Sequence, residues 1–379
     1  MTKKLRVGVI FGGRSSEHEV SIRSARSLIE ALDRKKYDVV PIAINKEGKW
    51  LPPALASDLL PAPTKKFFSP QTLSGPTDDV AIIGDPSRSG LVMLDRHEGG
   101  SAEPLDVVFP VLHGPYGEDG TLQGLLEMAN IPFVGCGTLA SACGMDKVIM
   151  KGLFRNAGLP ICAYAWFLRT DWESRPADVL RRVVRQIGFP CFVKPANLGS
   201  SVGISKATDK TSLEEALNLA ARYDRKVIVE EGIDAREIEC AVMGNDLPEA
   251  SLPGEYVVRQ KSAQFLDYTE KYASTGNVEF VVPAPVSKAI TARIQQMTVS
   301  AFQAIDGSGL ARVDFFLQRS SKKVLVNEIN TMPGLTDVSG FPKMWAASGL
   351  PFPQVLERLI ELAMERQRDR AKNVTSFGG

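Results

Sequence analysis

The chain has 379 residues, 44% of them hydrophobic, so it is long enough for two or three domains with separate cores. Its 45 Lys and Arg residues nearly balance 44 Asp and Glu, for a net charge of +1. This balance excludes the basic field that attracts nucleic acid, and no apolar run approaches the roughly 20 residues needed to span a bilayer. We therefore expect a protein that acts on small molecules, without nucleic-acid or membrane partners.

The cysteines and the N-terminus both favour a cytoplasmic protein. Five cysteines occur without a CxxC spacing, which predicts neither a disulfide framework nor a zinc site. The apolar run from Leu5 to Phe11 is short and contains Arg6, so we expect a first β-strand there rather than a signal peptide. A reducing compartment is the simplest environment for such a chain.

Residues 1–135 are predicted to form an N-terminal open parallel α/β domain. Strands are expected at Arg6–Phe11, Tyr37–Ile44 and Leu105–Leu112, and helices over Ile22–Leu32 and Thr121–Ala129. Strands that alternate with helices indicate a parallel sheet with helices on both faces.

Two local features add detail to this first domain. Ser16 to Glu19 has the form of a capping box at the start of the first helix. Residues 46–104 are rich in Pro, Gly and Ser and contain short apolar pieces at Val80–Ile83 and Leu91–Leu94. They are expected to form a hairpin-bearing insertion.

Residues 136–235 are predicted to form a second unit and residues 236–379 a third. In the second unit, helices are expected at Met145–Ala157, Val179–Ile187 and Ser212–Tyr223, and a capping box at Ser212 is expected to open the last of them. Strands are expected after Pro160, at Pro190–Pro195 and at Lys226–Glu231. In the third, helices are expected at Lys288–Ile305 and Phe352–Arg370, and a hairpin at Leu310–Gln318 and Lys323–Asn330.

A loop of small residues follows the strand that ends near Lys194. Backbone N–H groups can approach an anion closely at Gly199, the hydroxyls of Ser200 and Ser201 add donors, and Lys194 can supply charge to a phosphate. Neither the Walker A order nor the G-x-G-x-x-G order of dinucleotide folds is present. The alternative is an ordinary glycine-rich hairpin.

The hairpin in the third unit places two carboxylates and an amide beside an arginine. Arg312 and Asp314 share one face of their strand, as do Glu328 and Asn330. If the turn centres on Ser321, Asp314 lies opposite Glu328 and Arg312 opposite Asn330, with Cβ atoms about 5 Å apart. Oxygen ligands so placed suit Mg²⁺, which usually also takes substrate phosphate oxygens. The alternative is a solvated charged face, and a turn shifted by half a residue would break the pairing.

Two further motifs lie where strands end. Glu17 follows the first strand and could hold a substrate ammonium, although it could equally be a carboxylate at a helix N-terminus. His113 follows the strand at Leu105–Leu112 and is either structural or close to a substrate. The three histidines are not spaced as zinc ligands, which argues against a zinc hydrolase.

Together, seven segments resemble the D-alanine–D-alanine ligases, which belong to the ATP-grasp superfamily. They are GGRSSEHEVSIRSA (12–25), HGPYGEDGTLQG (113–124), MDKVIMK (145–151), FVKPANLGSSVGISK (192–206), REIECAVMG (236–244), FLDYTEKY (265–272) and RVDFFL…VNEINTMPGLT (312–336). The resemblance covers nearly the whole chain in the family's order. It implies a three-domain ATP-grasp architecture with ATP between the central and C-terminal domains.

The resemblance also implies an activity. The protein would form D-alanyl-D-alanine through D-alanyl phosphate, with release of ADP, for peptidoglycan precursor synthesis in the cytoplasm. ATP and two Mg²⁺ ions would be required, with Mn²⁺ as a substitute, and the protein would be a homodimer. A loop around 265–277 would close over the site, because water would otherwise hydrolyse the acyl phosphate.

Residue roles are carried over where the motifs match. The resemblance implies ATP contacts at Lys147, Lys194, Ser200, Ser201, Glu230, Ile233, Glu237 and Lys271. It implies magnesium ligands at Asp314, Glu328 and Asn330. It implies positioning of the first D-alanine by Glu17, Ser200 and Tyr272, oxyanion donors at Arg312 and the Gly334 N–H, and the carboxylate of the second substrate at Ser339. His113 and Gly340 would lie near the substrates.

Two rival readings stay open at this point. One is a relative that takes D-lactate or D-serine as second substrate, against which Tyr272 favours D-alanine by resemblance. Leu266, Gly340 and Glu231 depart from the family's usual residues, and Gly340 concerns the pocket for the second substrate. The other rival is a catalytically silent ATP-binding regulator, which would be expected to lack a metal ligand or Arg312; all of these are present.

Overall fold

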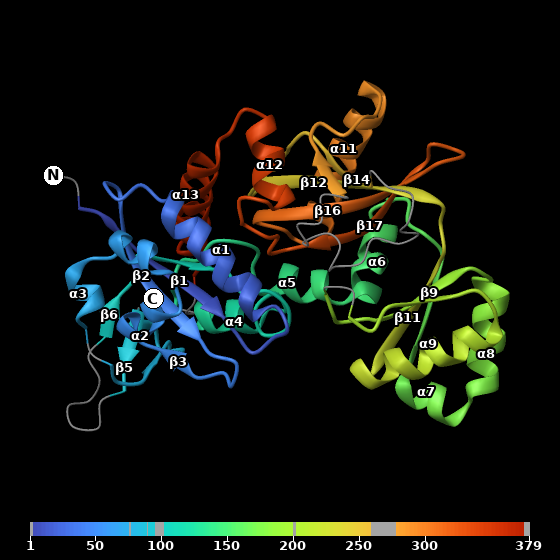
Figure 1. The fold of residues 1–379 in the computed structure, drawn as a ribbon, viewed down its shortest axis with the longest axis horizontal. Coiled ribbons are helices and arrows are strands. Elements are labelled where there is room, and N and C mark those ends of the chain that lie inside the picture. The colour runs from blue at the N-terminus through green and yellow to red at the C-terminus, as the bar shows by residue number, and fades with distance from the viewer. Residues whose placement is uncertain are drawn as a thin grey trace.

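The computed structural model describes residues 3–75, 77–88, 90–94, 102–199, 202–258 and 278–374. Ser200, Ser201, Lys271 and Tyr272, with the loop predicted at 265–277, lie outside these residues. The N-terminal sheet and the sheet of β8 to β11 lie at opposite ends of the molecule, with a C-terminal sheet between them (Figure 1). Within the described residues, no helix combines the length and apolar character needed to cross a bilayer.

The N-terminal sheet is parallel at its centre, as predicted. Its strands, in the order β3-β2-β1-β7, are β3 (Trp50–Leu51), β2 (Tyr37–Ile44), β1 (Leu5–Gly12) and β7 (Val107–Pro110). β1 pairs in parallel with both β2 and β7, and these strands are almost continuously apolar because both faces are buried.

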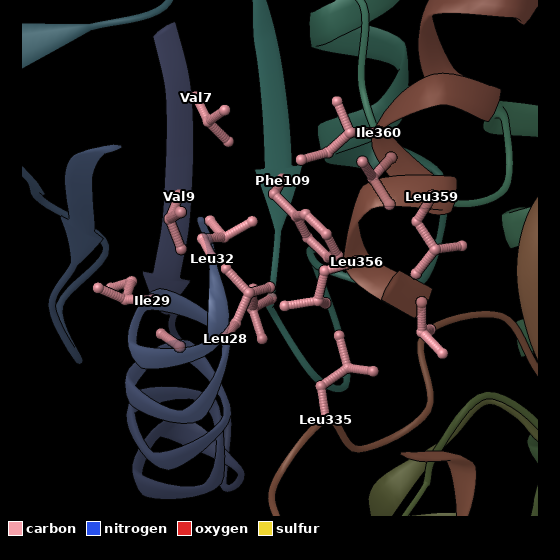
Figure 2. Packing of buried hydrophobic residues seen from close by; sticks show 14 of the residues in the cluster. Val7, Val9, Leu28, Ile29, Leu32, Phe109, Leu335, Leu356, Leu359 and Ile360 are labelled. Atoms are coloured by element: carbon pink, nitrogen blue, oxygen red, sulfur yellow. The ribbon is translucent and has the colours of Figure 1, made fainter. Parts of the chain in front are cut away.

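Helices cover both faces of this sheet, which confirms the predicted arrangement. On one face, Val7 and Val9 pack with Leu28 of α1 (His18–Ala31) and Leu356 of α13 (Phe352–Arg370), as Figure 2 shows. On the other face, Ile10 packs in a cluster with apolar residues of α4 (Thr121–Met128). The C-terminal helix α13 thus contributes to the core of the N-terminal domain.

The insertion contains the expected hairpin and several short helices. Its strands are β4 (Val80–Ala81), β5 (Gly90–Met93) and β6 (Ala102–Pro104), which pair antiparallel. Its helices are α2 (Pro53–Asp58), α3 (Pro70–Leu73) and the 3₁₀ turns η1 (Ala62–Phe67) and η2 (Pro86–Arg88). Val80 and Leu91 join the same apolar cluster as α4.

The central sheet is antiparallel and has two different faces. Its strands, in the order β10-β9-β11-β8, are β10 (Ser205–Ala207), β9 (Cys191–Pro195), β11 (Lys226–Glu231) and β8 (Tyr164–Leu168). The helices α7 (Arg169–Ser174), α8 (Pro176–Gln186) and α9 (Lys210–Tyr223) lie beside them. Val193 and Val229 enter the core with α8 and α9, so their neighbours Lys194 and Glu230 point to the opposite face.

The C-terminal sheet carries the longest strands. Its order is β15 (Val278–Val281), β14 (Gly254–Val258), β12 (Ala235–Gly244), β16 (Gly309–Gln318) and β17 (Val324–Asn330), with β13 (Glu249–Ala250) also paired to β12. One face packs on α11 (Lys288–Ala304), α5 (Thr138–Met145) and α6 (Lys147–Asn156). On the other face, α12 (Gly340–Ala347) and α13 cover the end of β12 that carries Ala241 and Met243. The three domain ranges given above stay a prediction.

The two predicted capping boxes are wrong in their residues. Glu17 is the N-cap of α1 and makes no side-chain cap bond; its N–H donates to Ser15 Oγ at 3.0 Å. At α9, Asp209 is the N-cap: the Ser212 N–H donates to Asp209 Oδ1 at 2.8 Å, and the Asp209 N–H donates to Ser212 Oγ at 3.1 Å. Ser212 therefore closes the box from the third helical position instead of opening it.

Candidate functional site

A cavity of about 920 Å³ lies between the central and C-terminal sheets and reaches the first loops of the N-terminal domain. Its walls come from β9 and β11 on one side and from β12, β16 and β17 on the other. The predicted site residues that line it are Glu17, His113, Lys147, Lys194, Glu230, Ile233, Glu237, Arg312, Asp314, Glu328, Asn330 and Gly334. Residues far apart in the sequence are thus brought to one cavity.

The predicted pairing of the hairpin is confirmed at the site. Asp314 lies opposite Glu328 and Arg312 opposite Asn330. The turn itself is shifted by half a residue from the predicted centre, since Leu317 pairs with Val324. An irregularity after Asp314, with Asn327 as the extra residue of β17, absorbs the shift. The expectation that such a shift would break the pairing is therefore wrong.

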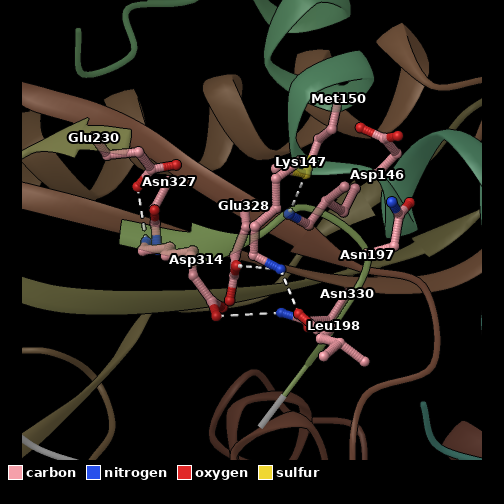
Figure 3. Close-up of polar contacts among 12 residues, drawn as sticks. Asp146, Lys147, Met150, Asn197, Leu198, Glu230, Asp314, Asn327, Glu328 and Asn330 are labelled. Atoms are coloured by element: carbon pink, nitrogen blue, oxygen red, sulfur yellow. Dashed lines mark hydrogen bonds and ion pairs between the residues drawn. The ribbon is translucent and has the colours of Figure 1, made fainter. Parts of the chain in front are cut away.

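The opposed carboxylates are surrounded by nitrogen donors (Figure 3). The guanidinium of Arg312 donates to both oxygens of Asp314, at 2.6 and 2.7 Å, and Asn330 Nδ2 donates to Asp314 Oδ2 at 3.2 Å. Lys147 Nζ lies 3.9 Å from Glu328 Oε2. Burial opposes ionisation of Glu328, but the charges of Lys147, Lys194 and Arg312 outweigh it and lower its pKa.

This donor set fits a hard divalent cation. Two opposed carboxylates with an amide oxygen beside them are oxygen donors of the kind that Mg²⁺ uses together with substrate phosphates. No group of three or more His, Cys, Asp and Glu side chains suited to a metal occurs within the described ranges. A site completed by substrate oxygens, as Mg²⁺ sites usually are, requires no such group.

Lysines gather around a buried carboxylate next to the metal-ligand candidates. Lys194 Nζ donates to Glu230 Oε2 at 2.7 Å, and Lys151 Nζ lies 3.1 Å from Glu230 Oε1. Burial alone would raise the pKa of Glu230, but Lys151 and Lys194 outweigh it and lower the pKa to about 2. Burial opposes the charge of Lys194 as well, yet Glu230 and Glu328 raise its pKa.

A further lysine links α6 to the small-residue loop. Lys147 is the first residue of α6, and its Nζ donates to the Leu198 carbonyl at 2.7 Å. Burial lowers the pKa of Lys147. Lys147 and Lys194 therefore face the same part of the cavity as the loop, an arrangement suited to a phosphate chain.

The opposite end of the cavity is built from the N-terminal domain. Glu17 lies beside the small-residue loop, because a Cβ on Gly199 would come within 3.7 Å of Glu17 Oε2. His113 Nδ1 lies 3.2 Å from the Met332 carbonyl and 3.5 Å from Glu118 Oε1. Burial opposes protonation of His113, but Glu118 outweighs it and raises the pKa. His113 thus connects the N-terminal domain to the loop after β17.

Ser339 and Gly340 do not line the cavity themselves but lie next to Gly334 and Glu239 of its wall. Ser339 Oγ accepts from the Thr336 N–H at 3.2 Å, and a Cβ on Gly334 would lie 2.8 Å from it. A Cβ on Gly340 would lie 2.8 Å from both Glu239 Oε2 and Phe280 Cζ. The Phe280 ring therefore occupies the space that a side chain at position 340 would need.

Sequence reasoning missed Glu239 and Lys151. Glu239 lies opposite Asp314 on β12, and its Oε2 is 3.4 Å from Arg312 Nε. It shares a strand face with Glu237, so strand periodicity could have identified it. Lys151 lies one helical turn after Lys147 and is fully buried, so helical spacing could have identified it.

The fold and the cavity suit one class of protein: an enzyme that takes a phosphate-bearing substrate together with a divalent cation. Comparison with known proteins is more specific. Residues 6–136 match the family model for the D-ala D-ala ligase N-terminus, and residues 153–361 match the model for the C-terminus.

Similar proteins cover nearly the whole chain. D-alanine–D-alanine ligase of Heliobacterium modesticaldum is 49% identical over 98% of both chains. The structure of D-alanine-D-alanine ligase from Coxiella burnetii has a TM-score of 0.80 and 37% identity, over 97% of this chain and 98% of that one. The VanG D-Ala:D-Ser ligase from Enterococcus faecalis has a TM-score of 0.81 and 36% identity, over 95% of this chain and 100% of that one. The chain belongs to the D-alanine–D-alanine ligase family of ATP-dependent ligases, which have the ATP-grasp fold.

Proposed function

We propose that this protein joins two D-alanine molecules into D-alanyl-D-alanine, with conversion of ATP to ADP, for peptidoglycan precursor synthesis. The observation that carries the proposal is the pairing of Asp314 with Glu328 in the same cavity as Lys147 and Lys194. Metal ligands and phosphate-binding lysines would then meet at one place, as phosphoryl transfer requires. The alternative of a silent ATP-binding protein is disfavoured, because Arg312 and all three candidate metal ligands line the cavity.

The nucleotide would lie between the two sheets that form the cavity. Lys147 and Lys194 would contact its phosphates, Glu230 and Ile233 its adenine and Glu237 its ribose. Ser200, Ser201 and Lys271 are proposed as further ATP contacts. Asp314, Glu328 and Asn330 would hold two Mg²⁺ ions, which Mn²⁺ could replace. Bound Mg²⁺ neutralises charge on the phosphate oxygens.

The first D-alanine would be positioned by Glu17, Ser200 and Tyr272, with Glu17 placed to hold its ammonium group. Its carboxylate attacks the γ-phosphoryl group, which gives D-alanyl phosphate and ADP. The amine of the second D-alanine then attacks the acyl carbon, and phosphate leaves. Closure of a loop around 265–277 over the site would protect the acyl phosphate from water.

The acyl-transfer step requires donors for the developing oxyanion and a site for the second carboxylate. Arg312 and the Gly334 N–H would be the oxyanion donors, and removal of one such donor typically costs about 100- to 1000-fold in rate. Ser339 would hold the carboxylate of the second substrate. His113, fixed between Met332 and Glu118, would orient groups near the substrates. Gly340 would help to determine the size of the pocket for the second substrate.

The deciding experiment measures ADP release by the purified protein with MgATP. D-alanine, L-alanine, D-lactate with D-alanine, and no substrate are compared, and products are identified by mass spectrometry. We expect release with D-alanine alone and a D-alanyl-D-alanine product. ATP binding without substrate-dependent ADP release would contradict the proposal and support a silent regulator.

A second candidate uses D-serine as second substrate. The VanG neighbour from Enterococcus faecalis is a D-Ala:D-Ser ligase, and Phe280 here occupies the space beside Gly340. A reaction with equimolar D-alanine and D-serine separates the two candidates. A predominant D-alanyl-D-serine product would show that D-serine is the second substrate, with the same acyl-phosphate mechanism.

The remaining parts of the proposal follow the family resemblance. A cytoplasmic location provides ATP, and a homodimer is the assembly that the resemblance implies. The proposed domains are 1–135, 136–235 and 236–379, with the substrates against the first and ATP between the other two.

A further inference from the structure

The irregularity in β17 decides which way the candidate metal ligands point. If the pairing of Leu317 with Val324 continued without an extra residue, Glu328 would lie opposite Val313. A slip of one residue turns a side chain to the other face of the sheet. Val313 belongs to the apolar cluster under α11, so the Glu328 carboxylate would then enter that core. The extra residue, Asn327, returns Glu328 to the cavity face.

One buried side chain from another element holds this extra residue. Lys151 of α6 donates from Nζ to the Asn327 carbonyl at 2.9 Å, and the lysine is 0% exposed. The neighbouring Met150 receives the Ile329 N–H on its sulfur at 3.4 Å. α6 therefore contacts the β17 backbone on both sides of Glu328.

The ammonium group of Lys151 also contacts β11, on the side of the cavity where the nucleotide is proposed to bind. Lys151 Nζ lies 3.1 Å from Glu230 Oε1, and the other oxygen of Glu230 accepts from Lys194 at 2.7 Å. Figure 3 shows Glu230 beside Asn327. One ammonium thus connects the strand of the metal ligands to the carboxylate that orients the phosphate-binding lysine.

We propose that Lys151 is a positioning residue, which fixes the extra residue of β17 and thereby keeps Glu328 and Asn330 directed at the bound metal. This inference rests on the proposed function, because it assigns a role to Lys151 in that same site. Lys151 touches neither substrate nor metal and acts through the Asn327 carbonyl and Glu230. Its loss should therefore affect metal and nucleotide before it affects D-alanine.

The test variant is Lys151→Met, which keeps most of the buried volume and removes the ammonium. Mn²⁺ binding to the protein–ADP complex is measured by electron paramagnetic resonance, and amide hydrogen exchange is followed over β17. We expect Mn²⁺ affinity to fall by about tenfold or more, as is typical when a group that orients metal ligands is lost. Exchange should accelerate at Glu328 to Asn330, while KM for D-alanine changes less than about twofold.

The matched control is Arg366→Met, which removes a partly buried cation of α13 outside the cavity. It should lower stability without a change in Mn²⁺ affinity. A folded Lys151→Met variant with wild-type Mn²⁺ affinity and wild-type exchange in β17 would overturn the proposal.

A second pair of variants covers the case in which Lys151→Met does not fold. Glu230→Gln alone is compared with Glu230→Gln combined with Lys151→Met, so that no unpaired carboxylate stays buried. Weaker Mn²⁺ binding by the double variant than by the single variant supports the role at Asn327, and equal binding overturns it. Wild-type protein without D-alanine-dependent ADP release would instead contradict the proposed function, and the Mn²⁺ comparison would still decide the role of Lys151.

Discussion

Three acidic residues lie side by side across the C-terminal sheet. Glu239 pairs with Asp314, and Asp314 pairs with Glu328. Three neighbouring negative charges would repel one another. The guanidinium of Arg312 offsets this repulsion, because its Nε lies 3.4 Å from Glu239 Oε2 and 2.6 Å from Asp314 Oδ1. Lys147 adds positive charge beside Glu328. These cations offset the repulsion within the row, whose oxygens would still be available to a bound cation.

The first prediction concerns the two candidate metal ligands. Asp314→Asn and Glu328→Gln each remove one negative charge with little change in shape. We expect each to lower D-alanine-dependent ADP release by roughly 100-fold or more, since charge neutralisation and positioning are the main contributions to phosphoryl transfer. The control is Glu249→Gln, an exposed carboxylate on β13 of the same sheet. Turnover of either ligand variant at the Glu249→Gln rate would contradict the metal assignment.

The second prediction concerns the dependence of stability on pH. The folded-state pKa of Glu230 is about 2, below its usual value of 4.5, because Lys151 and Lys194 outweigh the effect of burial. A depressed carboxylate pKa stabilises the fold above the unfolded-state value, and this stability is lost as pH falls through about 4.5 toward 2. The shift corresponds to a contribution on the order of 3 kcal/mol at neutral pH.

Thermal unfolding of wild type and Glu230→Gln between pH 7 and pH 3 tests whether the contribution of Glu230 to stability is lost as pH falls. The variant should have the lower Tm at pH 7, and the difference should be constant down to about pH 5. Below that it should narrow, because only the wild type loses an ionised Glu230. A difference that widens as pH falls would show that Glu230 is not the group responsible.

Elements with regular periodicity could be predicted from the sequence almost to the residue. The strands Tyr37–Ile44 and Lys226–Glu231 and the helix Phe352–Arg370 have their predicted bounds. Their apolar patterns are local: a nearly continuous apolar run in Tyr37–Ile44, whose two faces are both buried, and a one-sided apolar stripe on the helix. The N-caps Glu17 and Asp209 were not predicted, because several nearby Ser, Asp and Glu residues can serve as caps.

The candidate site could be predicted in part. Simple alternation places Asp314 on one face with Arg312, and Glu328 on one face with Asn330. Their predicted opposition is confirmed, but the turn lies half a residue from the predicted centre and the extra residue of β17 restores the pairing. The extra residue at Asn327 could not be predicted, because it depends on α6 packing against β17 from a distant part of the chain. Lys151 and Glu239 were not predicted, although each has a local signal: Lys151 follows Lys147 by one helical turn, and Glu239 shares a strand face with Glu237.

The third prediction concerns the start of α6. Asp146 Oδ1 accepts from the Val148 and Ile149 N–H groups, at 3.0 and 3.2 Å, and Asp146 also pairs with Lys226. Asp146→Ala should cost about 1 kcal/mol of stability through the lost cap. It should also raise KM for ATP several-fold, because Lys147 follows directly.

The control for this prediction is Ser287→Ala. Ser287 caps α11 by accepting from the Ile290 N–H at 3.3 Å, and neither residue lines the cavity. A similar loss of stability is expected, with KM for ATP unchanged. An equal rise of KM in both variants would mean that general destabilisation, and not the position of Lys147, sets nucleotide affinity.

At the scale of the whole molecule, the last helix joins parts that are distant in sequence. Leu356 of α13 packs with Val7 of the first strand (Figure 2). Met243 and Phe341 of the C-terminal part belong to the same apolar cluster. The sequence pattern predicts the helix Phe352–Arg370 but not its packing against the N-terminal sheet, because its apolar stripe could pack on any large apolar surface. The wall with Glu17 and His113 must be held in place against the C-terminal sheet, and α13 spans that junction.

The fourth prediction concerns the polar anchor of α13. Arg366 donates to the Phe133 carbonyl at 2.8 Å, to Ser308 Oγ at 2.6 Å and to the Gly135 carbonyl, and its guanidinium lies 4.3 Å from the centre of the Phe133 ring. Arg366→Met keeps the apolar stem but leaves these acceptors without their donor. We expect a loss of about 2–4 kcal/mol in the free energy of unfolding, measured by urea denaturation.

Arg368→Met is the control, because Arg368 is exposed on the same helix and its replacement should change stability by less than about 0.5 kcal/mol. The loss in Arg366→Met should be accompanied by faster amide exchange in β7 and α13 together. Arg366 ties this helix to the segment after α4, and Phe133 of that segment pairs with Val108 of β7. Faster exchange confined to α13 would show that the apolar cluster alone holds the N-terminal sheet in place. KM for D-alanine should rise in Arg366→Met and stay unchanged in Arg368→Met, because the loop with His113 continues from β7 and depends on the same junction.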